Sequence, residues 1–266
     1  YFLEHIVRLK VPRPAKLDSM LSGSLVHYIL EKALQDATFL QQTEGGDSHQ
    51  QMQQLAERLA EEYIQQLPQD DTKQPLTRRE QNTIRRIVEG MVPLLEFLQQ
   101  EQRQSKFHPI AYEMSIGAHR GDPGMRVALS HNHWAHLTGK IDRVDSMGEK
   151  NHCWLRVVDY KTGNKKFSLD NVYYGLDTQM LLYLFSLCSP HGKGFAESSL
   201  PAGVVYFLVS PSKTTLDREK ANAKAAPAFE LHGLITDEPE VYEGMDPNAT
   251  GKYVPFGFKK DGQPDT

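Results

Sequence analysis

The chain has little cysteine. Its 266 residues include two, Cys153 and Cys188, which stand 35 positions apart. Two thiols exclude a disulfide framework, and neither has another cysteine at the short spacing of a zinc site. This usage is typical of a reducing compartment, so we expect a cytoplasmic protein.

Long apolar runs and an excess of positive charge are also missing. No stretch approaches the roughly 18 apolar residues that a membrane-spanning helix needs, so we expect no membrane span. The 30 Lys and Arg against 34 Asp and Glu give a net charge of −4, which excludes a polycation that covers nucleic acid with its whole surface. With 39% hydrophobic residues and a mean hydropathy of −0.53, the chain is expected to fold around a core. Any DNA-binding surface is therefore local.

The sequence starts at Tyr1 instead of Met, has no signal-peptide pattern and stops in a polar string at Thr266. These ends indicate a piece of a longer protein. The length fits one elaborated domain, and we expect residues 1–266 to form a single domain of that longer chain.

Apolar periodicity predicts the order of the elements. Helical spacing predicts a first helix over residues 24–40, and the glutamine-rich stretch 44–105 is expected to be an insertion of two or three mostly solvated helices. Four β-branched or aromatic runs predict strands at 110–116, 137–145, 154–160 and 203–210, and a helix over 176–187 separates the last two. The order helix, insertion, three strands, helix, strand indicates an α/β fold with a mixed sheet. We expect residues 211–266 to be an irregular C-terminal extension.

Asp159 and Lys161 end the third predicted strand, just before Gly163. Residues two apart in a strand point the same way, so a carboxylate and an ammonium are directed at one place. Such charges at the end of an apolar strand are costly unless they are paired, hydrated or bound to a metal. A surface ion pair is the competing explanation.

Asp142 lies in the preceding predicted strand. The polar segment 146–152 can turn the chain, so the two strands are expected to pair as a hairpin that places Asp142 beside Asp159. Two converging carboxylates repel each other unless a hard divalent cation lies between them. Oxygen ligands without thiolates favour Mg²⁺ or Mn²⁺ over Zn²⁺.

Four further residues are weaker candidates, because each has an ordinary explanation. His27 on the first helix is typical of a hydrogen-bonded or capping side chain, and Glu113 of an exposed strand carboxylate. Gln179 and Tyr183 are four apart and share one helix face, where solvation or packing is the default role.

Taken together and in order, these residues resemble the RecB-type branch of the PD-(D/E)xK nuclease superfamily. The motifs that carry the resemblance are Gly23-x-x-x-His27, Gly139 to Arg143, Val158 to Gly163, and Gln179-x-x-x-Tyr183. Later segments, at 231–235, 243–246 and 259–262, are similar to the C-terminal part of the AddB (RexB) family, the second subunits of bacterial helicase-nucleases. The resemblance implies a restriction-endonuclease-like core of helix, three strands, helix and strand, with a helical insertion.

The resemblance also implies roles for the site residues. Mg²⁺ or Mn²⁺ would be held by His27, Asp142, Asp159 and the backbone carbonyl of Tyr160, with Lys161 near the attacking water. Asp142, Asp159 and Lys161 would be the catalytic residues. Supporting or DNA-binding roles would fall to Gln179, Tyr183, Glu113, Lys165 and Lys166.

The expected activity is metal-dependent exonuclease cleavage of DNA, within a bacterial, cytoplasmic helicase-nuclease that resects double-strand ends for recombinational repair. The expected partners are DNA, entering as a single strand from a duplex end, and the AddA (RexA) subunit. Many relatives carry an iron-sulfur cluster, but neither cysteine here occupies a position of its ligands, so such ligands are expected outside this sequence. A catalytically silent DNA-binding scaffold and a Cas4-like nuclease are the alternatives.

Overall fold

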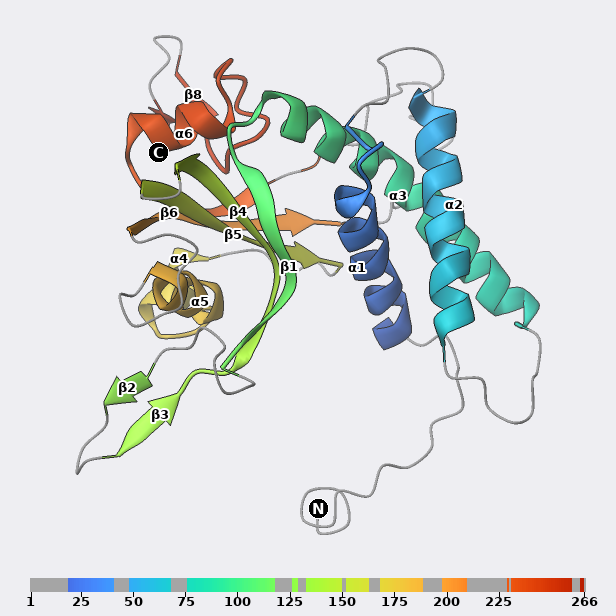
Figure 1. Cartoon of the computed structure of the whole chain (residues 1–266), viewed down its shortest axis with the longest axis horizontal. Helices are drawn as coiled ribbons and strands as arrows, with labels where there is room; N and C mark the ends of the chain where they lie inside the picture. The colour runs from blue at the N-terminus through green and yellow to red at the C-terminus, as the bar shows by residue number, and fades with distance from the viewer. Residues whose placement is uncertain are drawn as a thin grey trace.

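A computed structural model shows how the chain is arranged. It describes residues 19–40, 48–67, 76–117, 126–128, 133–149, 152–162, 168–188, 198–209, 229, 231–259 and 264–265. The described part contains a central sheet with helices on both faces (Figure 1). None of its helices is long and apolar enough to cross a membrane.

The central sheet is mixed and has five strands in the order β1-β4-β5-β6-β7. The strands are β1 (His108–Ile116), β4 (Gly139–Glu149), β5 (His152–Lys161), β6 (Ser199–Leu208) and β7 (Leu231–Ile235). β5 pairs in parallel with β6, and the other neighbouring pairs are antiparallel. The predicted α/β class is confirmed.

The hairpin predicted between the second and third strands is confirmed. β4 and β5 pair antiparallel, with Arg143 opposite Val158 and Glu149 opposite His152. Both strands run further into the predicted turn than the polar composition of 146–152 indicated, because the ladder pairs Ser146 with Leu155 and continues from there. This register places the ends of the two strands, with Asp142 and Asp159, beside each other.

The two faces of the sheet carry different helices. Val157 in β5 belongs to a core with α5 (Gln179–Cys188), whereas the next residue, Val158, belongs to a core with α1 (Ser19–Gln35), α2 (Ser48–Gln66) and α3 (Arg78–Gln104). This is the alternation that a strand buried on both faces requires. In Figure 1, α1 lies between the sheet and α2, and α5 lies on the opposite side with the short α4 (Leu169–Tyr173).

The expectation of a mostly solvated insertion was wrong. α2 and α3 pack on α1, and α3 alone has ten buried residues, among them the fully buried Glu101. The polar composition misled because the apolar positions Met91, Leu94 and Leu98 form a narrow stripe, and the exposed face holds the charge. α3 begins at a capping box in which Thr77 and Glu80 cap each other's backbone N–H.

The C-terminal extension is more regular than expected. β7 completes the sheet, and α6 (Pro239–Met245) buries Val241 and Met245 in a third apolar cluster with Phe107 and Ala202. Two small hairpins complete the described elements: β2 (Arg126–Ala128) with β3 (Trp134–His136), and β8 (Gly257–Phe258) with β9 (Pro264–Asp265). Five-residue strands such as β7 carry too weak a pattern to stand out in the sequence.

Candidate active site

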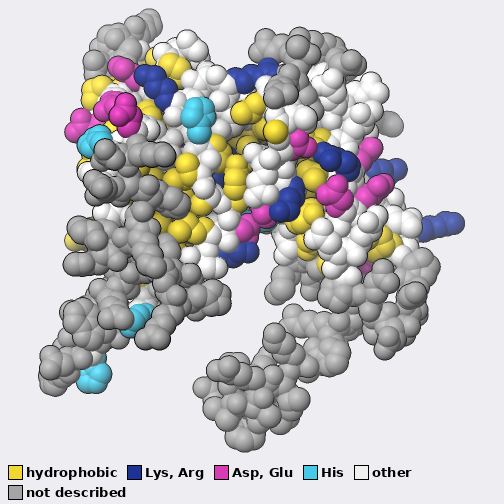
Figure 2. Space-filling view, in the orientation of Figure 1, with side chains coloured by type: hydrophobic (Ala, Val, Ile, Leu, Met, Phe, Trp, Pro, Cys, Tyr) yellow, Lys and Arg dark blue, Asp and Glu magenta, His cyan; other side chains and the backbone are white. Residues whose placement is uncertain are grey.

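Three side chains from three elements meet at one end of the sheet. His27 comes from α1, Glu113 from β1 and Asp142 from β4, and one ligand atom of each lies within 4.8 Å of the others. His27 Nδ1 is 3.4 Å from Asp142 Oδ1 and 3.5 Å from Glu113 Oε1. All three are part-exposed, and Figure 2 shows acidic and basic side chains side by side in the hollow that separates the sheet from the helices. We call these three residues the acidic cluster.

Glu113 reaches this cluster through an unusual backbone. It has a φ of +47° in the middle of β1, a left-handed conformation that residues other than glycine rarely adopt. The ladder is intact on both sides, with Tyr112 opposite Arg143 and Met114 opposite Ile141. Consecutive strand residues normally face opposite ways, yet Tyr112 and Glu113 both contact α1, the former through a hydrogen bond to the Leu34 carbonyl. A strained backbone that directs a carboxylate into a shared site is an independent indication of function.

Asp142 is held by the neighbouring strand. The Tyr160 backbone N–H donates to Asp142 Oδ2 at 2.9 Å, so one carboxylate oxygen is fixed by β5 and the other faces His27. The Tyr160 side chain is buried on the α1 face, and its ring lies edge-on to the His27 ring at 6.2 Å. The site residues of β4 and β5 are therefore tied together by backbone as well as by register.

Asp159 and Lys161 form an ion pair next to the acidic cluster. Their Oδ2 and Nζ atoms are 2.6 Å apart, as the alternation of strand side chains predicts. Burial raises the pKa of Asp159, and the nearby Asp142 carboxylate raises it further, against the opposing effect of Lys161. The Lys161 side chain is 39% exposed and lies 5.9 Å from the Tyr206 ring, so its ammonium is accessible at the site.

The charges of the cluster are arranged around His27. Hydrogen bonds to Asp142 and then Glu113 raise the pKa of His27 to about 10, so the imidazolium supplies the positive charge between the two carboxylates. Burial opposes ionisation of Glu113, but His27 and Lys140 outweigh it and hold the Glu113 pKa below its usual value. Lys140 forms an ion pair with Glu113. One imidazole nitrogen and carboxylate oxygens at this spacing fit a divalent cation that takes nitrogen and oxygen ligands.

Gln179 and Tyr183 contact the strand that carries Asp142. Gln179 donates a hydrogen bond to the Tyr183 hydroxyl, and that hydroxyl lies so close to Gly139 that any side chain there would overlap it. Gly139 begins the segment that ends in Asp142 and Arg143, so two of the sequence motifs are in direct contact. The close approach explains why glycine stands at this position.

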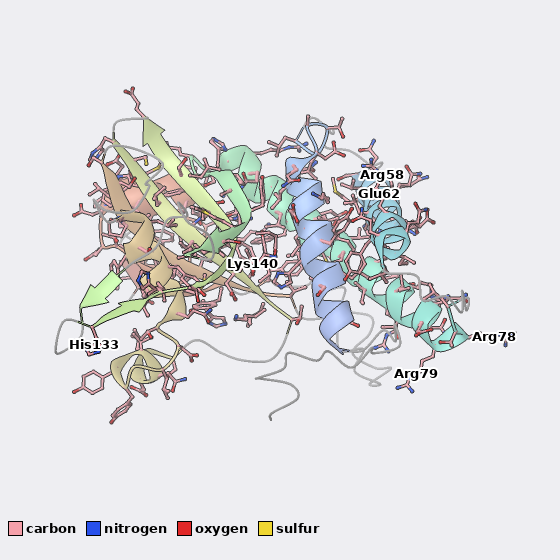
Figure 3. The ribbon with its side chains drawn as sticks, turned by 60° about the horizontal axis from the view of Figure 1, so that its bottom comes forward. Arg58, Glu62, Arg78, Arg79, His133 and Lys140 are labelled. Carbon is pink, nitrogen blue, oxygen red and sulfur yellow. The ribbon has the colours of Figure 1, made fainter. Side chains whose placement is uncertain are left out.

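The structure thus gathers most of the residues singled out in the sequence. His27, Glu113 and Asp142 form the acidic cluster, Asp159, Tyr160 and Lys161 adjoin it, and Gln179 and Tyr183 support it from α5. Glu113 occupies the place beside His27 and Asp142 that the sequence interpretation gave to Asp159. Lys165 and Lys166 lie outside the described residues. Figure 3 shows Lys140 between the sheet and α1, whereas Arg78 and Arg79 lie at the distant start of α3.

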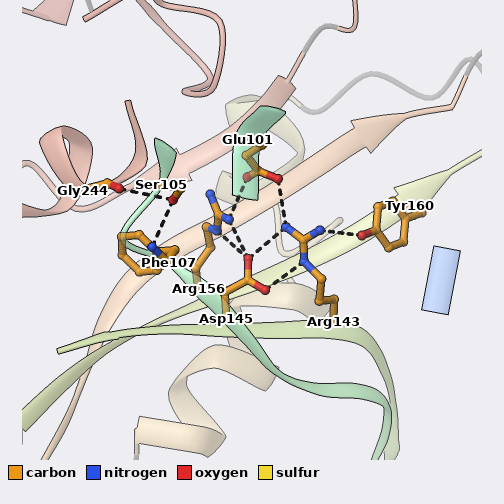
Figure 4. A network of polar contacts seen from close by, with 8 residues as sticks. All are labelled: Glu101, Ser105, Phe107, Arg143, Asp145, Arg156, Tyr160 and Gly244. Carbon is orange, nitrogen blue, oxygen red and sulfur yellow. Dashed lines mark hydrogen bonds and ion pairs between the residues drawn. The ribbon is translucent and has the colours of Figure 1, made fainter. Parts of the chain in front are cut away.

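A second group of charges, which the sequence did not reveal, lies beneath this site (Figure 4). It joins α3 to β4 and β5 through four side chains that are all 0% exposed, and we call it the buried ionic network: Glu101, Arg143, Asp145 and Arg156. Asp145 lies 2.8 Å from Arg143 Nε and 2.6 Å from Arg156 Nη2, and Glu101 Oε1 accepts from Arg156 at 2.8 Å. Burial opposes ionisation of Asp145, but the two guanidiniums keep its pKa below the usual value. Arg143 also donates to the Tyr160 hydroxyl at 2.7 Å, which links the network to the site.

The sequence profile of the PD-(D/E)XK nuclease superfamily matches residues 1–252, nearly the whole chain. The chain belongs to this superfamily. The family expected from the motifs is therefore confirmed, and the mixed sheet with the site at the ends of β4 and β5 is this family member's core.

Several relatives are named as the second of the subunits of an ATP-dependent helicase/deoxyribonuclease, which confirms the expected resemblance to such proteins. The protein of Desulforudis audaxviator is 34% identical over 78% of this chain, and that of Clostridium acetobutylicum is 31% identical over 67%. The Clostridium tetani protein is 26% identical over 99% of the chain. The matched parts make up 18%, 16% and 23% of these relatives, so the chain spans about a fifth of their length.

Proposed function

We propose that the chain is a metal-dependent deoxyribonuclease that removes nucleotides from DNA ends, within a helicase-nuclease that resects double-strand breaks. One observation carries the proposal: His27, Glu113 and Asp142 converge within 4.8 Å, beside the Asp159–Lys161 pair. The names of the relatives support the helicase-nuclease setting, in which an AddA-like subunit in the cytoplasm supplies the strand.

The residues present fit Mg²⁺ or Mn²⁺. Asp142, Asp159 and the Tyr160 carbonyl would hold the cation together with His27, and Glu113 joins them because of its position in the cluster. When bound, such a cation polarises the phosphodiester and lowers the pKa of a coordinated water. His27 would bind in its neutral form, so the proton that it otherwise holds between the carboxylates is exchanged for the cation.

Lys161 orients the attacking water or takes its proton. Its ammonium is fixed by Asp159 and accessible from the hollow, which suits a group that acts on a small molecule at the strand end. Lys140 on the other side of the cluster adds a second positive charge toward an incoming phosphate. Basic side chains near phosphates position a strand without distinguishing its bases, so we expect cleavage without sequence preference.

The test is cleavage of a labelled single strand by the full chain with Mg²⁺, with Mn²⁺ and with EDTA. We expect cutting with either cation, none with EDTA, and none in Asp159→Ala or Lys161→Ala at an unchanged far-ultraviolet circular dichroism spectrum. Metal-dependent cutting by both variants would overturn the catalytic assignment. Absence of cutting by the parent chain, with retained binding of single strands, would instead identify a DNA-binding scaffold.

A further inference from the structure

An apolar groove adjoins the candidate active site. It has a volume of about 350 Å³ and lies between α1, α3 and the ends of β5 and β6. Val26, Ile87, Met91 and Val209 contribute apolar surface to its walls. This size is at the lower end for ligand pockets, which range over roughly 300–1,000 Å³, and suits a single planar group.

Two glycines line this groove from different helices. Gly23 lies within α1 and Gly90 within α3, where glycine is less favourable than alanine. A β-carbon added at either position would meet no atom of the described residues within 4 Å, and neither residue has a positive φ. Internal packing and backbone geometry therefore do not require glycine at these positions, in contrast to Gly139. The remaining physical reason is an external group that approaches both helix backbones closely.

The groove is continuous with the site. Gly23 precedes His27 by four residues, so the two lie on the same face of α1 one turn apart. Thr162 lines the groove and directly follows Lys161. A strand whose scissile phosphate lies at the acidic cluster would therefore place a neighbouring nucleotide at the groove.

The charges around the groove suit a nucleotide. Arg86 contributes to its lining, and a guanidinium pairs well with a phosphate. We propose that the groove between Gly23 and Gly90 receives one nucleotide of the DNA strand, with its base against the apolar wall and its phosphate at Arg86. This inference rests on the proposed function, and it assigns a binding position that the catalytic residues do not define.

The experiment measures binding of a fluorescently labelled single strand to the full chain in EDTA, where no cleavage occurs. Gly90→Leu fills the groove, and Asn82→Leu is the control, because Asn82 is exposed on the same helix and does not line the groove. A base that loses its stacking surface costs about a tenfold change in affinity, so we expect that loss for Gly90→Leu and less than about twofold for Asn82→Leu.

Thermal unfolding of the same variants separates binding from folding. Gly90→Ala is expected to raise the unfolding midpoint while it weakens DNA binding, a combination that a purely structural glycine does not produce. A strand with one abasic position completes the test: wild type should lose affinity for it, and Gly90→Leu should lose no more than it already has.

Equal affinities of Gly90→Leu and Asn82→Leu would overturn the groove assignment. That result would leave the proposed function intact if wild type still cleaves with Mg²⁺ or Mn²⁺. Conversely, a chain that fails to cleave but binds DNA in a Gly90-dependent manner would retain the groove and lose the nuclease.

Discussion

The acidic cluster and the buried ionic network are built from adjacent residues of one strand, yet they have opposite designs. Asp142 belongs to the first and Arg143 to the second. The network has two guanidiniums and two carboxylates, all fully buried, so its charge is balanced within the protein. The acidic cluster is part-exposed and joins two carboxylates through one histidine, with a third carboxylate, Asp159, beside it.

This difference separates structure from function. A buried charge that lacks a partner is expensive, so a balanced and closed network is stable only as a complete set. An accessible cluster with excess negative charge and a strained backbone at Glu113 is costly for the fold, and a cation from solution offsets that cost. Four predictions test the contrast.

The largest expected effect comes from opening the network. Glu101→Ala leaves two buried guanidiniums with a single carboxylate, and we expect the free energy of unfolding to fall by about 3–5 kcal/mol. Urea denaturation followed by circular dichroism measures this loss. A change below about 1 kcal/mol would show that water or another group replaces the carboxylate.

The next effect distinguishes two aspartates three positions apart on β4. Asp142→Asn should reduce metal-dependent cleavage by about a hundredfold or more while the unfolding free energy changes by less than about 1 kcal/mol. Asp145→Asn should do the reverse to stability, because it removes the charge that both Arg143 and Arg156 require. Initial cleavage rates and urea midpoints of both variants provide the comparison. Parallel losses of activity and stability in the two would remove the distinction.

A smaller effect concerns the left-handed backbone of Glu113. Glu113→Gly and Glu113→Ala both remove the carboxylate, but only glycine adopts a φ of +47° without strain. We expect the glycine variant to be more stable than the alanine variant by about 1 kcal/mol, with the same weakened affinity for Mn²⁺. If alanine is the more stable of the two, the strand is regular at this position.

The smallest effect is the control for the first. Glu89 pairs with Arg85 on the exposed face of α3, at 3.7 Å, with both side chains more than half exposed. Glu89→Ala should change the unfolding free energy by at most about 0.5 kcal/mol, because water screens such pairs. A loss comparable with that of Glu101→Ala would mean that burial is not what sets the strength of the network.

The sequence was sufficient for the parts of the fold and site that depend on local patterns. Strand alternation predicted the shared face of Asp159 and Lys161, and the polar turn predicted the hairpin that brings Asp142 to them. It did not predict the importance of Glu113, because a left-handed residue in a strand leaves no mark in apolar periodicity. It also missed Glu101, since a charged residue in a glutamine-rich helix resembles a solvated one until its partners from β4 and β5 are known. Long-range pairing decides both cases.

The central claim is that the acidic cluster holds a divalent cation, and titration with Mn²⁺ tests it most directly. Electron paramagnetic resonance of free Mn²⁺ counts the ions bound by the full chain, by Asp142→Asn and by the surface control Glu89→Ala. The account predicts a saturable site in wild type and in Glu89→Ala that is absent or much weaker in Asp142→Asn. Unchanged Mn²⁺ binding by a folded Asp142→Asn chain would contradict it.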